Sequence, residues 1–391
     1  MKSNGGNEMV NPNEKVALAS CESYDKDILI QILDEQWKKI GLTPSFFQGK
    51  KIALKPNLVR KMDASLGGTT HPAVVEAVAE LCRQWGAKEV LLVESPGGPY
   101  NEMALRAAYR VCGMERASQG GAFALNYDTA FQTVDFPDGA VSKTFHILSP
   151  IMDADVVVNI CKLKSHGLTM MTGGVKNLFG TIPGIEKFEM HARFPDIRDF
   201  SAQLTDLCAF HLAEKPLLTV MDAIVGMEGN GPTNGKPRKI GAMLSSLNPF
   251  ALDTVASRLI GMEGKVIHLE QGRERGLVDK PEVVGATVES LAVKDFLPPD
   301  SAKKNVLAWL ADFWDGRLMR FFEPRPAINK KKCVGCGECV RSCPVHTIKL
   351  DKERRIAVID PTPCIKCFCC QELCPKDAVD IKQNIFIRII R

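Results

Sequence analysis

The sequence has no apolar run long enough to cross a membrane, since no stretch approaches the roughly 20 residues that a spanning helix requires. It also shows no signal-peptide pattern at its start, because Met1–Glu14 is polar and rich in Asn and Gly. A cytoplasmic location is therefore expected. Disulfides are uncommon in that compartment, so the cysteines of this chain require another explanation.

Two common nucleotide-binding motifs are missing as well. The segment Gly173–Gly180 contains Lys176 but lacks the G-x4-G-K-[ST] spacing of a P-loop, and Ser95–Gly98 is not a G-x-G-x-x-G fingerprint. ATP and NAD are therefore poor candidates for ligands. The H-E-x-x-H spacing is also absent, which leaves a mononuclear metal site built from separated histidines as a minor alternative.

Composition places the chain among ordinary globular proteins. Of its 391 residues, 45% are hydrophobic and 25% are charged, which suits two or three domains. The net charge of +4 is uneven, because residues 325–391 contain 14 Lys and Arg against 7 Asp and Glu. Such a surplus balances the negative charge of a bound group or attracts an acidic partner.

Cysteine carries the strongest signal. Eight of the 14 cysteines form two runs of the pattern C-x2-C-x2-C-x3-C-P, which start at Cys333 and Cys364. This spacing is typical of bacterial two-cluster ferredoxins, in which the fourth cysteine of each run binds the cluster of the other run. One 4Fe–4S cluster is therefore expected on Cys333, Cys336, Cys339 and Cys374, and the other on Cys364, Cys367, Cys370 and Cys343.

Structural zinc and a disulfide framework explain these runs less well. Zinc sites usually combine two closely spaced pairs of Cys or His ligands. Disulfides need an oxidising compartment. The module resembles bacterial-type ferredoxins over about residues 328–385. Clusters of this kind suit a reducing, anaerobic cell. Cys369 has no place in the pattern, and packing against the cluster is favoured over service as a replacement ligand.

A basic patch, Lys330–Lys332, directly precedes the first cysteine run. It suits the docking of an acidic redox partner of the ferredoxin or flavodoxin type. Nucleic-acid binding is less favoured, since no basic stripe interleaved with aromatic residues accompanies the patch.

The first 300 residues alternate short apolar runs with amphipathic helical patterns, which predicts an α/β fold with a mostly parallel sheet and flanking helices. The predicted strands are 16–20, 51–54, 90–94, 155–160 and 217–221, and the predicted helices are 72–85, 197–212 and 249–260. Residues 1–300 are thus expected to form a ligand-binding domain. A linker helix over 301–327, containing Trp309, Trp314, Phe321 and Phe322, would dock a small α+β ferredoxin-like domain over 328–391.

Several polar motifs come directly after predicted strands. Ligands bind at the carboxyl ends of the strands in open α/β sheets, so these residues are expected to surround one site. Converging lysines would bind a carboxylate or phosphate, and histidine would transfer protons near neutral pH. The candidate ligand-binding residues are Lys55, Asn57, Ser95, Lys162, Lys176, Asn177, Asp222, Glu228 and Asp253. The candidate catalytic residues are His71, Lys164, His166 and His191, of which His166 is favoured as the proton donor.

Each of these residues also has an ordinary structural explanation. Lysines are usually solvated on the surface, and His71 stands where a helix would start. Asp222, Glu228 and Asp253 would either orient the cations or bind a metal.

The order of these motifs resembles one known family. The segments KPNLV, TTHP, VLLVESPGG, KLKSH, TGGVKNLFG, MDAIVGMEGNGP and NPFALD are similar to the prokaryotic domain-of-unknown-function family 362 over about residues 50–260. Members of that family often carry a C-terminal two-cluster ferredoxin module. Two departures are Cys161, where the family usually has proline, and Asn248, where Asp is common. The resemblance implies the architecture and the site but supplies no reaction.

Together these features predict a ferredoxin-coupled oxidoreductase that reduces an anionic organic substrate or cofactor bound in the α/β domain. A non-enzymatic electron carrier, or a maturation factor that delivers a cluster or a metal, is the alternative. The polar residues at the sheet edge count against a simple carrier, because a docking surface needs no group of Lys and His around glycine loops.

Overall fold

The computed structural model describes residues 14–302 and 324–382. Its main feature is a nine-stranded mixed sheet in the order β11-β1-β10-β9-β7-β2-β3-β4, with β8 paired to β7. The strands are β1 (Lys15–Ser20), β2 (Lys51–Lys55), β3 (Glu89–Leu92), β4 (Ala124–Leu125), β7 (Val156–His166), β8 (Met170–Thr172), β9 (Leu217–Glu228), β10 (Lys236–Ser246) and β11 (Glu282–Gly285). The run from β9 to β4 is parallel, which confirms the predicted mostly parallel α/β fold.

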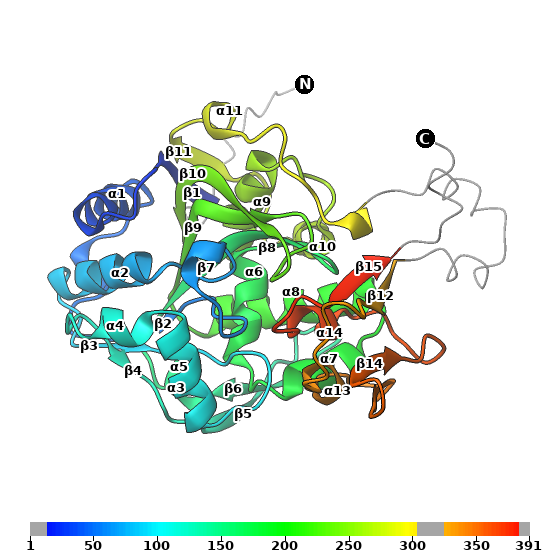
Figure 1. Cartoon of the computed structure of the whole chain (residues 1–391). Coiled ribbons are helices and arrows are strands. Elements are labelled where there is room, and N and C mark those ends of the chain that lie inside the picture. Colours follow the sequence, from blue (N-terminus) through cyan, green and yellow to red (C-terminus); the bar gives the residue numbers. More distant parts are fainter. Residues whose placement is uncertain (1–13, 303–323, 383–391) are drawn as a thin grey trace.

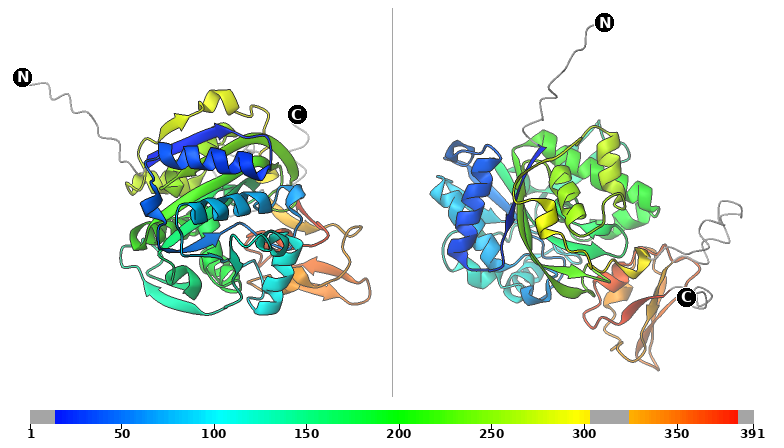
Figure 2. Two further views of the ribbon diagram at one scale, coloured as in Figure 1. Left: turned by 90° about the vertical axis from the view of Figure 1, so that its left-hand side faces the viewer. Right: turned by 90° about the horizontal axis from the view of Figure 1, so that it is seen from above.

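Helices cover both faces of this sheet, as Figures 1 and 2 show. One face packs on α1 (Lys26–Lys39), α2 (Pro72–Gln84), α3 (Glu102–Val111) and α4 (Met114–Ser118). The other packs on α6 (Gly174–Asn177), α8 (Ile197–Glu214), α9 (Pro249–Leu259) and α10 (Ile267–Glu274). The remaining elements of this part are β5 (Phe131–Asp135), β6 (Thr144–Leu148), α5 (Ser149–Met152), α7 (Glu186–Arg193) and α11 (Val288–Leu291). The central strands are therefore buried on both sides.

Local sequence signals explain why α2 starts where it does. The His71 side chain accepts a hydrogen bond from the Ala73 N–H, and Pro72 takes the first helical position, where a missing N–H costs nothing. The apolar stripe that includes Val74, Val78 and Leu81 is buried against the sheet. The predicted helix is thereby confirmed to within one residue at its end.

Two strands are longer than the sequence pattern predicts. Strand β7 continues through His166 instead of ending at 160, because β8 pairs with Lys164–His166 and supplies new hydrogen-bond partners. Strand β9 likewise continues to Glu228 along β10. The prediction that Lys162, Lys164 and His166 come after the end of the strand is therefore wrong. These three side chains lie on the strand itself.

The C-terminal module is small and irregular. It contains β12 (Arg325–Ile328), α13 (Glu338–Arg341), β13 (Ile348–Asp351), β14 (Ile356–Ile359), α14 (Cys369–Glu372) and β15 (Val379–Lys382). Strand β12 pairs with β15, and β13 pairs with β14. The first and last described strands of the module therefore form one antiparallel pair. In Figure 1 the module lies beside the carboxyl-edge region of the sheet.

Part of the predicted linker lies outside the described residues. This applies to positions 303–323 and so to Trp309, Trp314, Phe321 and Phe322, and the predicted domain boundaries stay a prediction. In the parts of the chain that the structure describes, no helix is both long and apolar enough to cross a bilayer.

Candidate functional site

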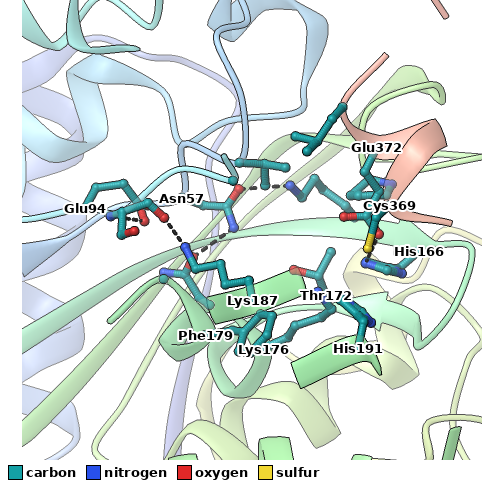
Figure 3. A pocket seen from close by; sticks show the side chains of 18 of the residues that line it. Asn57, Glu94, His166, Thr172, Lys176, Phe179, Lys187, His191, Cys369 and Glu372 are labelled. Atoms are coloured by element: carbon teal, nitrogen blue, oxygen red, sulfur yellow. Dashed lines mark hydrogen bonds and ion pairs between the residues drawn. The ribbon is translucent and has the colours of Figure 1, made fainter. Parts of the chain in front are cut away.

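A largely buried polar cavity lies beyond the carboxyl ends of β2 and β3 and beside the end of β7 (Figure 3). Its volume is about 80 Å³, enough for a small anion or a few water molecules. Loops of the α/β domain form most of the wall, and α14 of the module closes it. The charged and polar lining residues are Lys55, Asn57, Glu94, Ser95, Lys164, His166, Thr172, Lys176, Asn177, Lys187, His191, Cys369 and Glu372.

Lys55 forms the inner end of the cavity, and its charge is already balanced by a carboxylate. Its Nζ lies 2.9 Å from Glu94 Oε2 and 3.4 Å from Asn177 Oδ1. Asn57 Nδ2 donates to the same Asn177 oxygen at 2.8 Å. A Cβ at Gly180 would collide with the ends of the Lys55 and Glu94 side chains, so a larger residue there would force this pair to move. The network fixes the wall of the cavity rather than offering a free cation.

Lys164 differs because no carboxylate pairs with it. Its Nζ donates to Asn57 Oδ1 at 2.9 Å and to the Gly68 carbonyl at 2.8 Å, both neutral acceptors. Burial, reinforced by the positive charge of Lys176, lowers the pKa of Lys164 to about 7. Near neutral pH this amine therefore exchanges a proton readily.

Two further lysines face the cavity. The Lys176 Nζ lies 5.6 Å from the centre of the Phe179 ring, and no hydrogen bond or ion pair joins it to the described residues. Lys187 donates to the Ser95 carbonyl, and burial lowers the pKa of Lys187 to about 7. Lys187 was not among the candidates predicted from the sequence. Its position four residues before His191 on α7, on the same helix face, is the signal that could have identified it.

His166 is held in one tautomer. Its Nδ1 accepts hydrogen bonds from the Leu168 and Thr169 N–H groups, at 3.0 and 3.3 Å, so the ring proton sits on Nε2. That Nε2 lies 3.2 Å from Glu372 Oε1 of the module. Burial and the charge of Lys176 lower the pKa of His166 to about 4, so the ring is neutral at pH 7.

Glu372 brings a negative charge to the cavity from the module. Burial opposes its ionisation, but His166 and Lys176 lower the pKa of Glu372 to about 2. The contact between Glu372 Oε1 and His166 Nε2 is not aligned as a hydrogen bond, and neither atom has another partner among the described residues. In Figure 3, Cys369, Glu372 and His166 converge on one side of the cavity. A ligand with polar groups would satisfy both atoms.

Three predicted site residues form a separate buried network. Lys162 Nζ lies 2.7 Å from Asp222 Oδ2, and Tyr24 donates to Asp222 Oδ1 at 3.1 Å. The His71 N–H donates to Asp222 at 3.0 Å, while the His71 ring stacks on Tyr24 at 3.8 Å and caps α2. These groups are satisfied by one another and do not line the cavity. The register of β7 against β9 shifts between Lys162 and Lys164, and their amines accordingly bond different partners.

Asp253 and Glu228 also lie away from the cavity. Asp253 accepts from the Gly174 and Val175 N–H groups at 2.6 and 2.9 Å, and burial raises its pKa to about 7. Glu228 accepts from the Leu297 N–H at 3.1 Å. Both carboxylates anchor loops. Among the described residues, no three His, Cys, Asp or Glu side chains are grouped to hold a single metal ion.

The eight motif cysteines line two cavities of the module in the crossed sets that the sequence predicts. One cavity is bordered by Cys333, Cys336, Cys339 and Cys374, and the other by Cys343, Cys364, Cys367 and Cys370. Backbone N–H groups donate to three of the sulfurs at 3.2–3.4 Å, from Thr347 to Cys343, Ala357 to Cys333 and Ala378 to Cys374. Four thiols around a cavity, with N–H groups aimed at sulfur, fit a 4Fe–4S cluster.

The module is attached to the α/β domain next to these cysteines. Arg60 donates to the Cys374 carbonyl and lies 3.0 Å from Asp377 Oδ1. Thr233 Oγ1 donates to the Glu372 carbonyl at 3.0 Å. These contacts hold α14 against the cavity.

The fold and the cysteine sets define an iron–sulfur protein with a ferredoxin-like module. Residues 332–378 match the 4Fe-4S dicluster domain, and residues 52–258 match the Domain of unknown function (DUF362). The second match spans more than half of the chain, which therefore belongs to the DUF362 family. Both predicted parts of the architecture are confirmed.

The chain is similar to proteins of two kinds. It is 33% identical over 270 residues to the thylakoid-associated protein sll1697 of Synechocystis sp.. That alignment covers 67% of this chain and 79% of that protein. It is also 33% identical over 58 residues to a ferredoxin of Methanothermococcus thermolithotrophicus. That alignment covers 14% of this chain and 95% of the ferredoxin. The ferredoxin match supports iron–sulfur electron transfer.

Among solved structures, the lactate racemase apoprotein of Thermoanaerobacterium thermosaccharolyticum aligns with a TM-score of 0.37 and 15% identity. The alignment covers 63% of this chain and 58% of that chain.

Changing Cys343 to serine is expected to damage the second cluster, although Cys343 belongs to the first run. The reason is the crossed arrangement, in which Cys343 borders the same cavity as Cys364, Cys367 and Cys370. Iron analysis of anaerobically purified protein should fall from about eight towards about four per chain. Electron paramagnetic resonance should show the other cluster intact. Loss of the Cys333 cluster alone would contradict the crossed arrangement, and Cys112→Ser, outside the module, is the control.

Proposed function

We propose that this protein is a ferredoxin-coupled oxidoreductase that reduces an anionic organic substrate or cofactor in the cavity closed by α14. One observation carries the proposal: Cys369 borders both the cavity of the second cysteine set and the lysine-lined cavity. The two clusters, when bound, supply electrons one at a time. The electron-transfer module and the ligand site thus share a wall.

Charge favours an anionic ligand. Lys164, Lys176 and Lys187 face the cavity without a carboxylate bonded to any of them, while Lys55 is already paired with Glu94. Glu372 offsets one of the three charges. Three buried cations so close together repel one another, and an anion would relieve that repulsion. A carboxylate or a phosphate group matches these ammonium donors.

The same lysines are the better proton donors. Reduction of a C=O or C=C bond consumes two protons with its two electrons. A proton donor works best when its pKa lies near the working pH, and burial lowers the pKa of Lys164 and Lys187 to about 7. His166 is neutral at that pH, and its Nε2–H lies beside Glu372. We therefore assign proton donation to Lys164 or Lys187, and to His166 the placement of Glu372.

Electrons would enter at the first cysteine set. Cys336 of this set is exposed, and Lys330–Lys332 are exposed directly before it. An acidic carrier of the ferredoxin or flavodoxin type fits this basic surface. The second set, next to α14, would then pass electrons to the ligand.

The test begins with the small molecule that the anaerobically purified protein retains, identified by mass spectrometry. Protein reduced with dithionite and freed of excess reductant is then mixed with that compound. Reoxidation of the clusters with formation of one reduced product per two electrons supports the proposal. Reoxidation by a carrier protein only, with the compound unchanged, would favour the non-enzymatic carrier. Net transfer of iron to an acceptor apoprotein would favour the maturation factor.

Replacing Lys176 with alanine is expected to weaken binding of the retained anion by about tenfold or more, because one unpaired buried cation is lost. Isothermal titration with the purified compound measures the effect. Lys280→Ala, which removes an exposed lysine, is the matched control and should bind normally. Iron content should be unchanged in both variants. Equal affinity in the Lys176 variant would remove Lys176 from the site.

A further inference from the structure

The two cysteine runs have the same spacing, so each residue of one run has an equivalent 31 positions away in the other. Helices α13 and α14 occupy equivalent positions, and each is preceded by a residue in the left-handed conformation, Gly337 with φ 77° and Phe368 with φ 62°. The backbone is therefore repeated. A difference in side chains between the two helices reports what each helix faces.

The side chains differ at the positions that face the ligand cavity. Glu338 and Arg341 of α13 form an ion pair with each other at 2.6 Å, with much of the Arg341 side chain in solvent. The equivalent residues of α14 are Cys369 and Glu372, which both line the polar cavity. A self-contained surface pair on one helix is thus replaced by two side chains directed at a ligand site on the other.

Cys369 occupies a particular place in that arrangement. Its side chain is buried, with 2% of the residue exposed, and it borders the cavity of the second cysteine set as well as the polar cavity. Cys367, a predicted ligand of the second cluster, stands two residues before Cys369 and borders the same cavity, so both thiols lie beside the place of that cluster. His166 Nε2 and Glu372 Oε1, both buried and without aligned partners among the described residues, face the same space.

We propose that Cys369 is a positioning residue that raises the reduction potential of the second cluster by donating its S–H to the Cys367 sulfur. Reduction adds negative charge to a cluster and its thiolates, and a hydrogen-bond donor stabilises the more negative state. Glu338, at the equivalent position of the first run, has no such donor to offer. Cys369 thereby makes the second cluster, which lies beside the ligand cavity, the one that is preferentially reduced.

This inference rests on the proposed function only for the purpose of the difference in reduction potential between the two clusters. That purpose is delivery of electrons to the cavity. The potential itself is measured without any substrate. A failure here would leave the oxidoreductase proposal in place, and an unidentified substrate does not affect the measurement.

The experiment is a redox titration of the full chain, purified anaerobically with both clusters and followed by electron paramagnetic resonance. Cys369→Ala should shift the second cluster to a more negative potential and leave the first cluster unchanged. Cys369→Ser retains a donor, so its potential should lie between those of the alanine variant and the unaltered protein. Glu338→Ala, the matched change in the first run, should leave the second cluster unchanged.

Three results would overturn the proposal. The first is an unchanged second-cluster potential in Cys369→Ala. The second is an equal shift of both clusters, which indicates a general change in the module. The third is loss of the second cluster in both Cys369 variants, combined with a full iron complement in Cys370→Ser, because Cys369 would then be an iron ligand in place of Cys370.

Discussion

Replacing Lys162 with methionine is expected to lower the free energy of unfolding by about 3–5 kcal/mol. Both Lys162 and its partner Asp222 have side chains that are 0% exposed, and their charged atoms lie 2.7 Å apart. The substitution leaves the Asp222 carboxylate buried without its cation. Burial of an unpaired charge costs far more than the lost contact itself. Urea unfolding of the α/β domain, followed by far-ultraviolet circular dichroism, measures the change.

The control for this prediction is an exposed pair. Lys38→Met removes a similar contact to Asp34, but the Lys38 side chain is 64% exposed, so the expected loss is within about 0.5 kcal/mol. A second variant, Lys162→Met combined with Asp222→Asn, should recover part of the stability because no buried charge remains. If Lys162→Met proved as stable as the unaltered protein but bound the anion poorly, Lys162 would be a ligand residue, as its sequence position first indicated.

Anion affinity is expected to fall as the pH rises from 6 to 9. Burial lowers the pKa of Lys164 and of Lys187 to about 7, so both amines are mostly charged below pH 7 and mostly neutral above it. An anion that needs one of these protons loses about tenfold in affinity per pH unit above the pKa, and one that needs both loses about a hundredfold. Sulfate is a suitable probe because its own charge is constant over this range.

Lys187→Met tests the source of that pH dependence. Removal of one titrating amine should lower the affinity at pH 6 and make the decline above pH 7 shallower. His166 and His191 do not contribute between pH 6 and 9, since burial lowers their pKa values to about 4 and about 3. Affinity that is independent of pH in the unaltered protein would show that neither lysine carries the exchanging proton. Chloride at the same ionic strength separates specific binding from screening.

The sequence predicted those parts of the structure that depend on neighbouring residues. The start of α2 is fixed by His71 and Pro72 and by an apolar stripe within 13 residues, so its bounds were predictable. The spacing of the cysteines, compared with the two-cluster ferredoxin pattern, also predicted which four of them border each cavity of the module. Strand β7 was predicted too short, because its last residues gain their hydrogen bonds from β8 and β9, and polar side chains hid the continuation.

Part of the lining of the cavity was predicted from the sequence, and part was not. The predicted lining residues include Lys55, Lys164, Lys176, His166 and His191. Glu372 was missed because it stands between cluster cysteines, and nothing local shows that α14 folds back against the sheet. Lys162 and Asp222 were grouped with the site because each comes directly after a predicted strand. Their side chains satisfy each other, which only the register of β7 against β9 reveals.

The attachment of α14 to the sheet edge also has a kinetic meaning. A carrier that must collide with its enzyme delivers electrons at a rate that depends on the concentration of both proteins. Here Arg60 and Thr233 hold the ferredoxin-like module against the cavity within one polypeptide, so its local concentration there is fixed and dilution does not lower it. Under the proposed function, delivery of electrons to the cavity would then be a first-order step, and only the reduction of the module by an outside protein would depend on diffusion.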